Sequence, residues 1–189
     1  MFGSTAPPEA TEIVPWLERL SVRPGNRVLD VGCGRGRFAK AAAEVVGAEG
    51  LVLAADPDLG KLRALERPEV AAHLLPVAAN GRDLPVPTAD FDVAILGFVL
   101  HELDEPYPVL NEARRCLREE GRLLVFEWTP EVPVKAPGAR RLASSEVQRL
   151  FDSAGFRVDD VIELSQSVYA VAGSMAKVLC CGAYSPVLV

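Results

Sequence analysis

Three alternating glycines follow a short apolar segment near the start of the chain. Residues 28–31 read Val-Leu-Asp-Val, and Gly32, Gly34 and Gly36 come directly after them. Apolar side chains then recur at helical spacing through residues 38–46. A strand, a glycine turn and a helix in this order bring backbone N–H groups close to a ligand at the carboxyl edge of a sheet. The segment therefore predicts a ligand site built on a parallel α/β sheet.

The spacing of these glycines narrows the choice of ligand. A dinucleotide fingerprint needs a further glycine three residues after the second one, and that position holds Arg37. Gly-x-Gly-x-Gly preceded by Asp30 resembles the first motif of class I S-adenosylmethionine (SAM) dependent methyltransferases. The similarity is to the small-molecule C- and O-methylating group that includes quinone-biosynthesis enzymes, and it covers residues 27–173. In that family the turn packs against the methionine end of SAM, and the acidic residue faces the ammonium.

Length, charge and cysteine spacing limit the other classes of function. The chain has 189 residues, which suits one domain with a sizeable core. Its net charge of -6 argues against nucleic acid as a partner. No apolar run reaches the ~18 to 20 residues of a membrane span, and the first residues lack a basic start and an apolar stretch, so we expect a cytoplasmic protein. With two histidines and no Cys-x-x-Cys, we expect no metal.

Apolar runs alternate with helical patterns along the chain, which favours a βαβ series and a parallel sheet. Helices are expected near residues 9–20, 105–119 (with Gly121 as its cap) and 144–154 (with Ser144 as its N-cap). Strands are expected near residues 28–31, 51–56, 74–78, 92–97 and 122–127. Two later runs, about 157–164 and 167–172, predict an antiparallel hairpin.

This order matches the seven-stranded methyltransferase sheet, a Rossmann-like doubly wound α/β fold that is mostly parallel and ends in the hairpin. We expect residues 1–26 to form a helix and turn of the same domain and residues 27–173 to form the SAM-binding part. Residues 174–189, with Cys180 and Cys181, form an extension to which the sequence assigns no role.

Asp56 ends the second expected strand, twenty residues beyond Gly36. A carboxylate at this edge of a doubly wound sheet can accept hydrogen bonds from both ribose hydroxyls of a nucleoside. Asp58 is closer to the next helix and is the better candidate for its N-cap. An NAD enzyme would use the same carboxylate, so Asp56 indicates a nucleoside without identifying it.

Asn80 follows the third expected strand, where the methyltransferase family has an aspartate. The resemblance implies that its amide oxygen accepts from the adenine amine, with Gly81 beside the ring. Because asparagine is also an ordinary turn former, a purely structural role stays open. The resemblance implies further cofactor contacts at the turn and at the strand ends: Asp30, Gly32, Cys33, Gly34, Gly36, Pro57, Gly97 and Phe98.

His101 and Glu102 follow the fourth expected strand, in a segment that the family places beside the sulfonium. A histidine there can act as general base near neutral pH, or it can simply pack at the start of a helix. Glu102 is either a substrate contact or a solvated carboxylate at a helix start. The side chains expected to border the substrate are Trp16, Glu127 and Trp128.

The function that these features favour is methyl transfer from SAM to a small-molecule acceptor by in-line displacement. The protein's task is then to hold the nucleophile in line and to exclude water. A noncatalytic SAM-binding protein is the main alternative. A nucleotide-linked oxidoreductase and a protein methyltransferase are the remaining ones, and the sequence specifies neither the acceptor nor the oligomeric state.

Overall fold

The protein folds around a seven-stranded sheet in the order β3-β2-β1-β4-β5-β7-β6. The computed structural model describes residues 8–65, 73–133 and 140–176. Strands β1 to β5 are parallel, and β7 pairs antiparallel with both β5 and β6. This confirms the mostly parallel doubly wound sheet that closes with an antiparallel hairpin.

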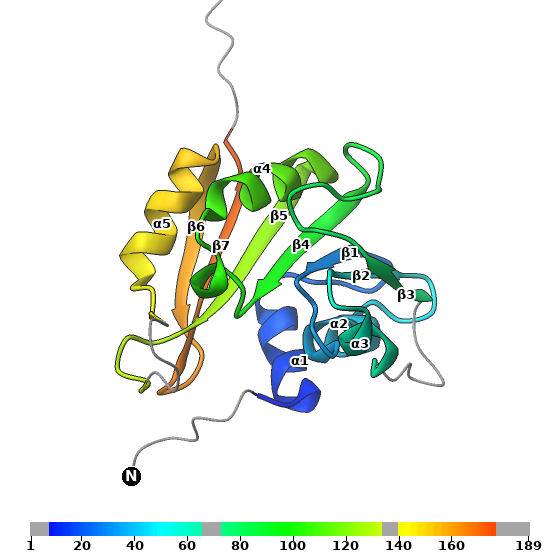
Figure 1. Cartoon of the computed structure of the whole chain (residues 1–189), viewed down its shortest axis with the longest axis horizontal. Coiled ribbons are helices and arrows are strands. Elements are labelled where there is room, and N and C mark those ends of the chain that lie inside the picture. The colour runs from blue at the N-terminus through cyan, green and yellow to red at the C-terminus, as the bar shows by residue number, and fades with distance from the viewer. Residues whose placement is uncertain (1–7, 66–72, 134–139, 177–189) are drawn as a thin grey trace, which may run out of the picture.

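The elements alternate along the chain as a βαβ series (Figure 1). The helices are α1 Ala10–Arg19, α2 Arg37–Val46, α3 Leu59–Arg63, α4 Pro106–Cys116 and α5 Ser144–Ser153, with a 3-10 turn η1 at Leu100–Glu102. The strands are β1 Arg27–Val31, β2 Leu51–Asp56, β3 His73–Ala78, β4 Phe91–Gly97, β5 Leu117–Trp128, β6 Phe156–Glu163 and β7 Val168–Met175.

Helices cover both faces of the sheet (Figure 1). One face packs α1, α2 and Leu62 of α3 against alternate strand residues such as Val28 and Ile95. The other face packs α4 and α5 against the intervening residues, such as Leu29 and Leu96. Because successive side chains of a strand point to opposite faces, the central strands are largely apolar on both faces, with Asp30 in β1 as a buried exception.

Two details of the expected elements are wrong. The helix near residues 105–119 ends at Cys116, and the chain is already extended at its C-cap Leu117. Leu117 pairs with Phe91, and the register shifts before Val93 pairs with Arg122, so Gly121 lies within β5 and caps no helix. The N-cap of α5 is Ala143, whose backbone N–H donates to Glu146 at 2.8 Å; Ser144 is the first helical residue. Cys180 and Cys181 lie outside the described residues.

Candidate active site

The glycine turn after β1 is fastened to the neighbouring strand through its backbone. The N–H groups of Gly32 and Cys33 donate to the carbonyl oxygen of Ala55 in β2, at 2.8 and 3.0 Å. Gly34 has a φ of 57°, and a Cβ added to it would meet no atom within 4 Å. Gly36 has a φ of 79°, and its added Cβ would lie 2.7 Å from Leu65. A side chain at Gly36 would therefore clash with Leu65, whereas Gly34 exposes its backbone to an open space.

That space is a cavity of about 400 Å³ at the carboxyl edge of β1, β2 and β4. It contains most of the residues expected from the sequence. The expected residues on its wall are Gly32, Cys33, Gly34, Asp56, Pro57, Asn80, Gly81, Gly97, Phe98, His101, Glu102 and Trp128. The structure thus brings together groups that are up to 96 positions apart, from Gly32 to Trp128, in one hollow.

Asp56 and Asp58, at the end of β2 and just after it, accept hydrogen bonds from different parts of the backbone. Asp56 is buried; one of its oxygens accepts from the N–H of Gly34 and the other from the N–H of Asp58, both at 2.9 Å. Asp58 is the N-cap of α3 and accepts from the N–H groups of Gly60 and Lys61, at 2.7 and 3.2 Å. The assignment of the helix cap to Asp58 is confirmed, and Asp56 ties the glycine turn to the cavity wall.

Asp30 lies outside the cavity wall, within β1. It is 1% exposed, and its Oδ2 atom has no hydrogen-bond partner. Burial raises the pKa of this carboxyl to about 7, the backbone N–H of Ala39 opposes the rise, and the negative charge of Asp56 adds to it. One oxygen of this buried carboxyl thus lacks a hydrogen-bond partner, and an atom of this kind is suited to a cationic or hydrogen-bonding ligand.

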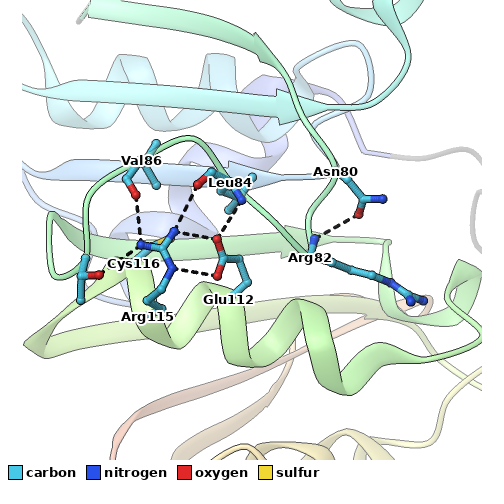
Figure 2. A network of polar contacts seen from close by, with 8 residues as sticks. Asn80, Arg82, Leu84, Val86, Glu112, Arg115 and Cys116 are labelled. Atoms are coloured by element: carbon cyan, nitrogen blue, oxygen red, sulfur yellow. Dashed lines mark hydrogen bonds and ion pairs between the residues drawn. The ribbon is translucent and has the colours of Figure 1, made fainter.

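Asn80 lies in a tight turn that follows β3. Its side-chain oxygen accepts from the N–H of Arg82 at 3.0 Å (Figure 2). Its carbonyl oxygen accepts from the N–H of Asp83, also at 3.0 Å. Asn80 therefore has the structural role in a turn that the sequence left open. The same oxygen retains a second lone pair, and Asn80 lines the cavity, so the turn does not preclude a ligand contact.

A network on α4 holds the loop that follows Asn80. Glu112 accepts from the N–H of Leu84 at 2.8 Å and pairs with Arg115 at 2.6 and 2.8 Å (Figure 2). Arg115 donates in turn to the carbonyl oxygens of Leu84 and Val86, at 3.2 and 3.0 Å. The pKa of Glu112 is lowered by the hydrogen bond from Arg115. No signal in the sequence had pointed to this network.

His101 lies in the turn η1 and contacts Glu127 at the end of β5. Its Nδ1 atom is 2.6 Å from one oxygen of Glu127, and its backbone N–H donates to the other oxygen at 3.2 Å. Glu127 is fully buried and is not among the residues that line the cavity. The reason is that His101 folds back over the strand end and takes both carboxylate oxygens.

Aromatic rings close the remaining side of the cavity. Phe98 stacks on Trp128 with ring centroids 4.5 Å apart, and the guanidinium of Arg141 lies 5.6 Å from the centre of the Trp128 ring. Trp16 instead packs on Phe126, with ring centroids 6.3 Å apart, and is not among the residues that line the cavity. A helix residue at core spacing buries its ring against the sheet more readily than it borders a pocket.

Basic side chains on the cavity wall were not singled out as site residues. They are Arg35, Arg37 and Lys61. Lys61 sits three residues after the Asp58 cap, and a search for cations near that cap would have found it. Nothing in the sequence marks the apolar wall residues Leu103 and Val109, because their position depends on how η1 and α4 turn over the sheet.

The chain is similar in sequence to a known protein family. Residues 29–125, just over half of the chain, match a family described as "Methyltransferase domain". The chain belongs to this methyltransferase family. The matched segment begins within β1 and ends within β5, so it includes the glycine turn, Asp56, Asn80 and His101.

One curated relative is the ubiquinone/menaquinone biosynthesis C-methyltransferase UbiE of Ectopseudomonas mendocina (strain ymp). It is 36% identical over 118 residues, which are 60% of this chain and 46% of the relative. The chain therefore spans less than half the length of that relative. The methyltransferase family, together with matching structures of SAM-dependent methyltransferases, supports S-adenosylmethionine as the cofactor.

Solved structures confirm the fold. A SAM-dependent methyltransferase from Aquifex aeolicus matches with a TM-score of 0.76 and 24% identity, over 90% of this chain and 94% of that one. The [4+2]-cyclase SpnF matches with a TM-score of 0.71 and 18% identity, over 88% of this chain and 80% of that one. In the part of the methyltransferase that the structure describes, no helix is long and apolar enough to cross a membrane.

The described residues of this methyltransferase fit S-adenosylmethionine. The bare backbone at Gly34 leaves room for a ligand to approach the turn, and Asp56 places a carboxylate at the edge where a ribose is held. The orphaned oxygen of Asp30 suits the ammonium of the methionine part. The basic side chains on the wall suit its carboxylate.

Proposed function

We propose that the chain transfers a methyl group from S-adenosylmethionine to a small-molecule acceptor. The observation that carries the proposal is the cavity in which Gly34, Asp56 and Asn80 share one hollow with His101 and Trp128. Cofactor-binding candidates and a titratable group thus face the same space. A volume of about 400 Å³ lies at the lower end of the usual range for small-molecule sites.

In this proposal the cofactor residues are Asp30, Gly32, Cys33, Gly34, Gly36, Asp56, Pro57, Asn80, Gly81, Gly97 and Phe98. Asp56 accepts from the ribose hydroxyls, and Asn80 accepts from the adenine amine. Bound S-adenosylmethionine supplies a methyl group on a cationic sulfur, which leaves as a neutral thioether. The chain itself binds, orients the acceptor and excludes water.

His101 is the proposed general base, and Glu102 a weaker candidate on the same turn. His101 lines the cavity while one ring nitrogen is held by Glu127, which supports an oriented imidazole. The stacked Phe98 and Trp128 rings give the acceptor an apolar wall. A flat, mainly apolar acceptor fits this wall better than a highly charged one.

A second candidate is a chain that binds the cofactor and performs other chemistry or none. The match to the [4+2]-cyclase SpnF favours considering it, because the same fold there carries a name other than methyltransferase. Residues 27–173 are the proposed cofactor-binding unit under either reading. A cytoplasmic location is also proposed, supported by the free thiols of Cys33 and Cys116.

Two experiments test the proposal. Calorimetry with SAM, S-adenosylhomocysteine and NAD should show saturation by the first two only. Incubation with methyl-labelled SAM and fractionated cell lysate should then place label in the small-molecule fraction. Label in the protein fraction would support a protein methyltransferase instead. Tight SAM binding without any labelled product would support the second candidate, and saturation by NAD alone would refute SAM as the ligand.

A further inference from the structure

Glu127 and His101 make two contacts with each other at the cavity. The two oxygens of Glu127 contact two groups of the same residue: one oxygen lies 2.6 Å from the ring Nδ1, and the other accepts from the backbone N–H at 3.2 Å. Glu127 is 0% exposed, and the His101 side chain is 10% exposed. A fully buried carboxylate needs such donors, because leaving it unpaired in the interior is costly.

The pair exists because the chain reverses direction after β4. Phe98 has a φ of 62°, a left-handed conformation that is uncommon for a residue with a side chain. Its N–H donates to the carbonyl of Phe126 at 2.8 Å, and its ring stacks on Trp128. These contacts hold the reversal, and the following 3-10 turn returns His101 over the end of β5. Strained backbone that the surroundings hold in place is frequent at functional sites.

The pairing determines which ring nitrogen carries the proton. An ionised carboxylate can only accept, so Nδ1 of a neutral His101 must hold the hydrogen, and Nε2 keeps its lone pair. Among the described residues, no group makes a hydrogen bond to Nε2. Nε2 is also not one of the buried side-chain atoms that lack a hydrogen-bond partner. His101 also lines the cavity. The unprotonated nitrogen therefore belongs to the cavity side of the ring.

We propose that Glu127 is a positioning residue that holds His101 as the Nδ1–H tautomer, so that Nε2 accepts a proton from the methyl acceptor. This inference rests on the proposed methyl transfer and narrows its acceptor to a protic nucleophile, a neutral hydroxyl, amine, thiol or acidic C–H group. The acceptor's bond to hydrogen breaks and its proton goes to Nε2. Its electron pair forms the bond to the methyl carbon, whose bond to sulfur breaks with the pair retained by sulfur.

The tautomer is directly measurable because the chain contains two histidines, His73 and His101. We would label the protein with 15N-histidine, assign the rings with His73→Gln, and record long-range 1H–15N spectra at pH 7.5 with and without S-adenosylhomocysteine. The expected result is the Nδ1–H tautomer for His101 in both samples. An Nε2–H tautomer, or a fully charged ring at this pH, would overturn the proposal whether or not methyl transfer is found.

The variant Glu127→Gln tests whether Glu127 determines the tautomer of His101. Glutamine keeps the shape but offers one acceptor and one donor, and the His101 backbone N–H requires the acceptor. The amide nitrogen then faces the ring and donates to Nδ1, which moves the ring proton to Nε2. We expect the spectrum of this variant to change to the Nε2–H tautomer. An unchanged Nδ1–H spectrum would show that Glu127 does not set the proton's position.

Glu127→Gln also distinguishes a role in positioning His101 from a role in binding SAM. Glu127→Gln should lower transfer of labelled methyl to the small-molecule fraction by about 100-fold, in the range of one general base, with the calorimetric Kd for SAM within about twofold of wild type. Glu120→Gln, an exposed change on the same strand, should leave both unchanged. Equal transfer by Glu127→Gln and wild type would refute the inference. A wild-type protein that transfers no label would refute the proposed function, while the spectra still decide the pairing.

Discussion

The carboxylate of Asp56, at the end of β2, accepts the backbone N–H of Gly34, in the turn after β1, at a distance of 2.9 Å. Its other oxygen accepts the N–H of Asp58 at the same distance. One buried side chain thus holds both the glycine turn and the backbone of Asp58, the N-cap of α3. Because each oxygen already has a backbone donor, the carboxylate is held rigidly at the cavity wall before any ligand arrives.

Asp56→Asn is expected to weaken SAM binding by about tenfold or more. The amide nitrogen cannot accept, so one of the two backbone N–H groups loses its partner, which costs about 1–3 kcal/mol. Calorimetry would give the affinity and thermal melting the stability. Asp58→Asn is the matched control, because its oxygen still caps α3, and its Kd should stay within about twofold. Equal affinities of the two variants would contradict a cofactor role for Asp56.

Gly34→Ala should fold and fail to bind SAM. Its φ of 57° strains an alanine by about 1–2 kcal/mol. The new methyl meets no protein atom within 4 Å and therefore projects into the space reserved for the ligand. Gly25→Ala is the control, because Gly25 has a φ of 80°, equally open surroundings and no place on the cavity wall. Similar melting of the two variants with loss of binding only in Gly34→Ala is the expected result; binding retained by Gly34→Ala would count against the site.

Arg115→Lys should lower the free energy of unfolding by about 1–3 kcal/mol. The guanidinium bonds Glu112 with two nitrogens and also reaches the carbonyls of Leu84 and Val86, a geometry that an ammonium cannot reproduce (Figure 2). Urea denaturation followed by circular dichroism would measure the change. The comparison is Arg82→Lys, whose ion pair with Glu105 is exposed and should contribute less than about 1 kcal/mol. A greater loss in the Arg82 variant would mean that the network does not anchor the loop.

The sheet and the cofactor side of the site follow from local sequence. Apolar runs and helical spacing identify the parallel strands, and the glycine turn, Asp56 and Asp58 follow those strands at once, so their placement requires only a doubly wound sheet. Gly121 was misassigned because a glycine after a helical pattern usually marks a C-cap. Here β-pairing of Leu117 with Phe91 takes the chain out of the helix earlier.

The pairing of Glu127 with His101 could not be read from the sequence. It depends on a chain reversal at Phe98, and a left-handed phenylalanine leaves no signal comparable to that of a glycine. Glu127 ends an apolar strand and looks like an edge carboxylate exposed to ligand. Only the return of the 3-10 turn over β5 buries it. Trp16 is a similar case, since its helix fixes its face but not whether that face reaches the cavity.

Asp30 should make stability and cofactor affinity depend on pH in opposite directions. Its folded pKa of about 7 lies above its ordinary value of 3.8 because the carboxyl is buried. Its contribution to the free energy of unfolding is therefore largest at low pH, falls as the pH rises from about 4 to about 7, and is level above that. Asp30→Asn removes this dependence, so without ligand the variant should gain melting temperature relative to wild type between pH 5 and pH 8.

The affinity for SAM should depend on pH in the opposite direction. An ammonium near Asp30 favours the ionised carboxyl, so wild-type affinity for SAM should increase as the pH rises through about 7, and Asp30→Asn should bind weakly with a flatter profile. Methylthioadenosine, which lacks the amino-acid part of SAM, is the matched ligand control, and its affinity should show no such increase. Melting curves and calorimetry at pH 5, 6, 7 and 8 would measure both effects. If Asp30→Asn and wild type showed the same pH profile for SAM, the orphaned oxygen would not face the cofactor's charge, and the ammonium would have to be held by another group on the cavity wall.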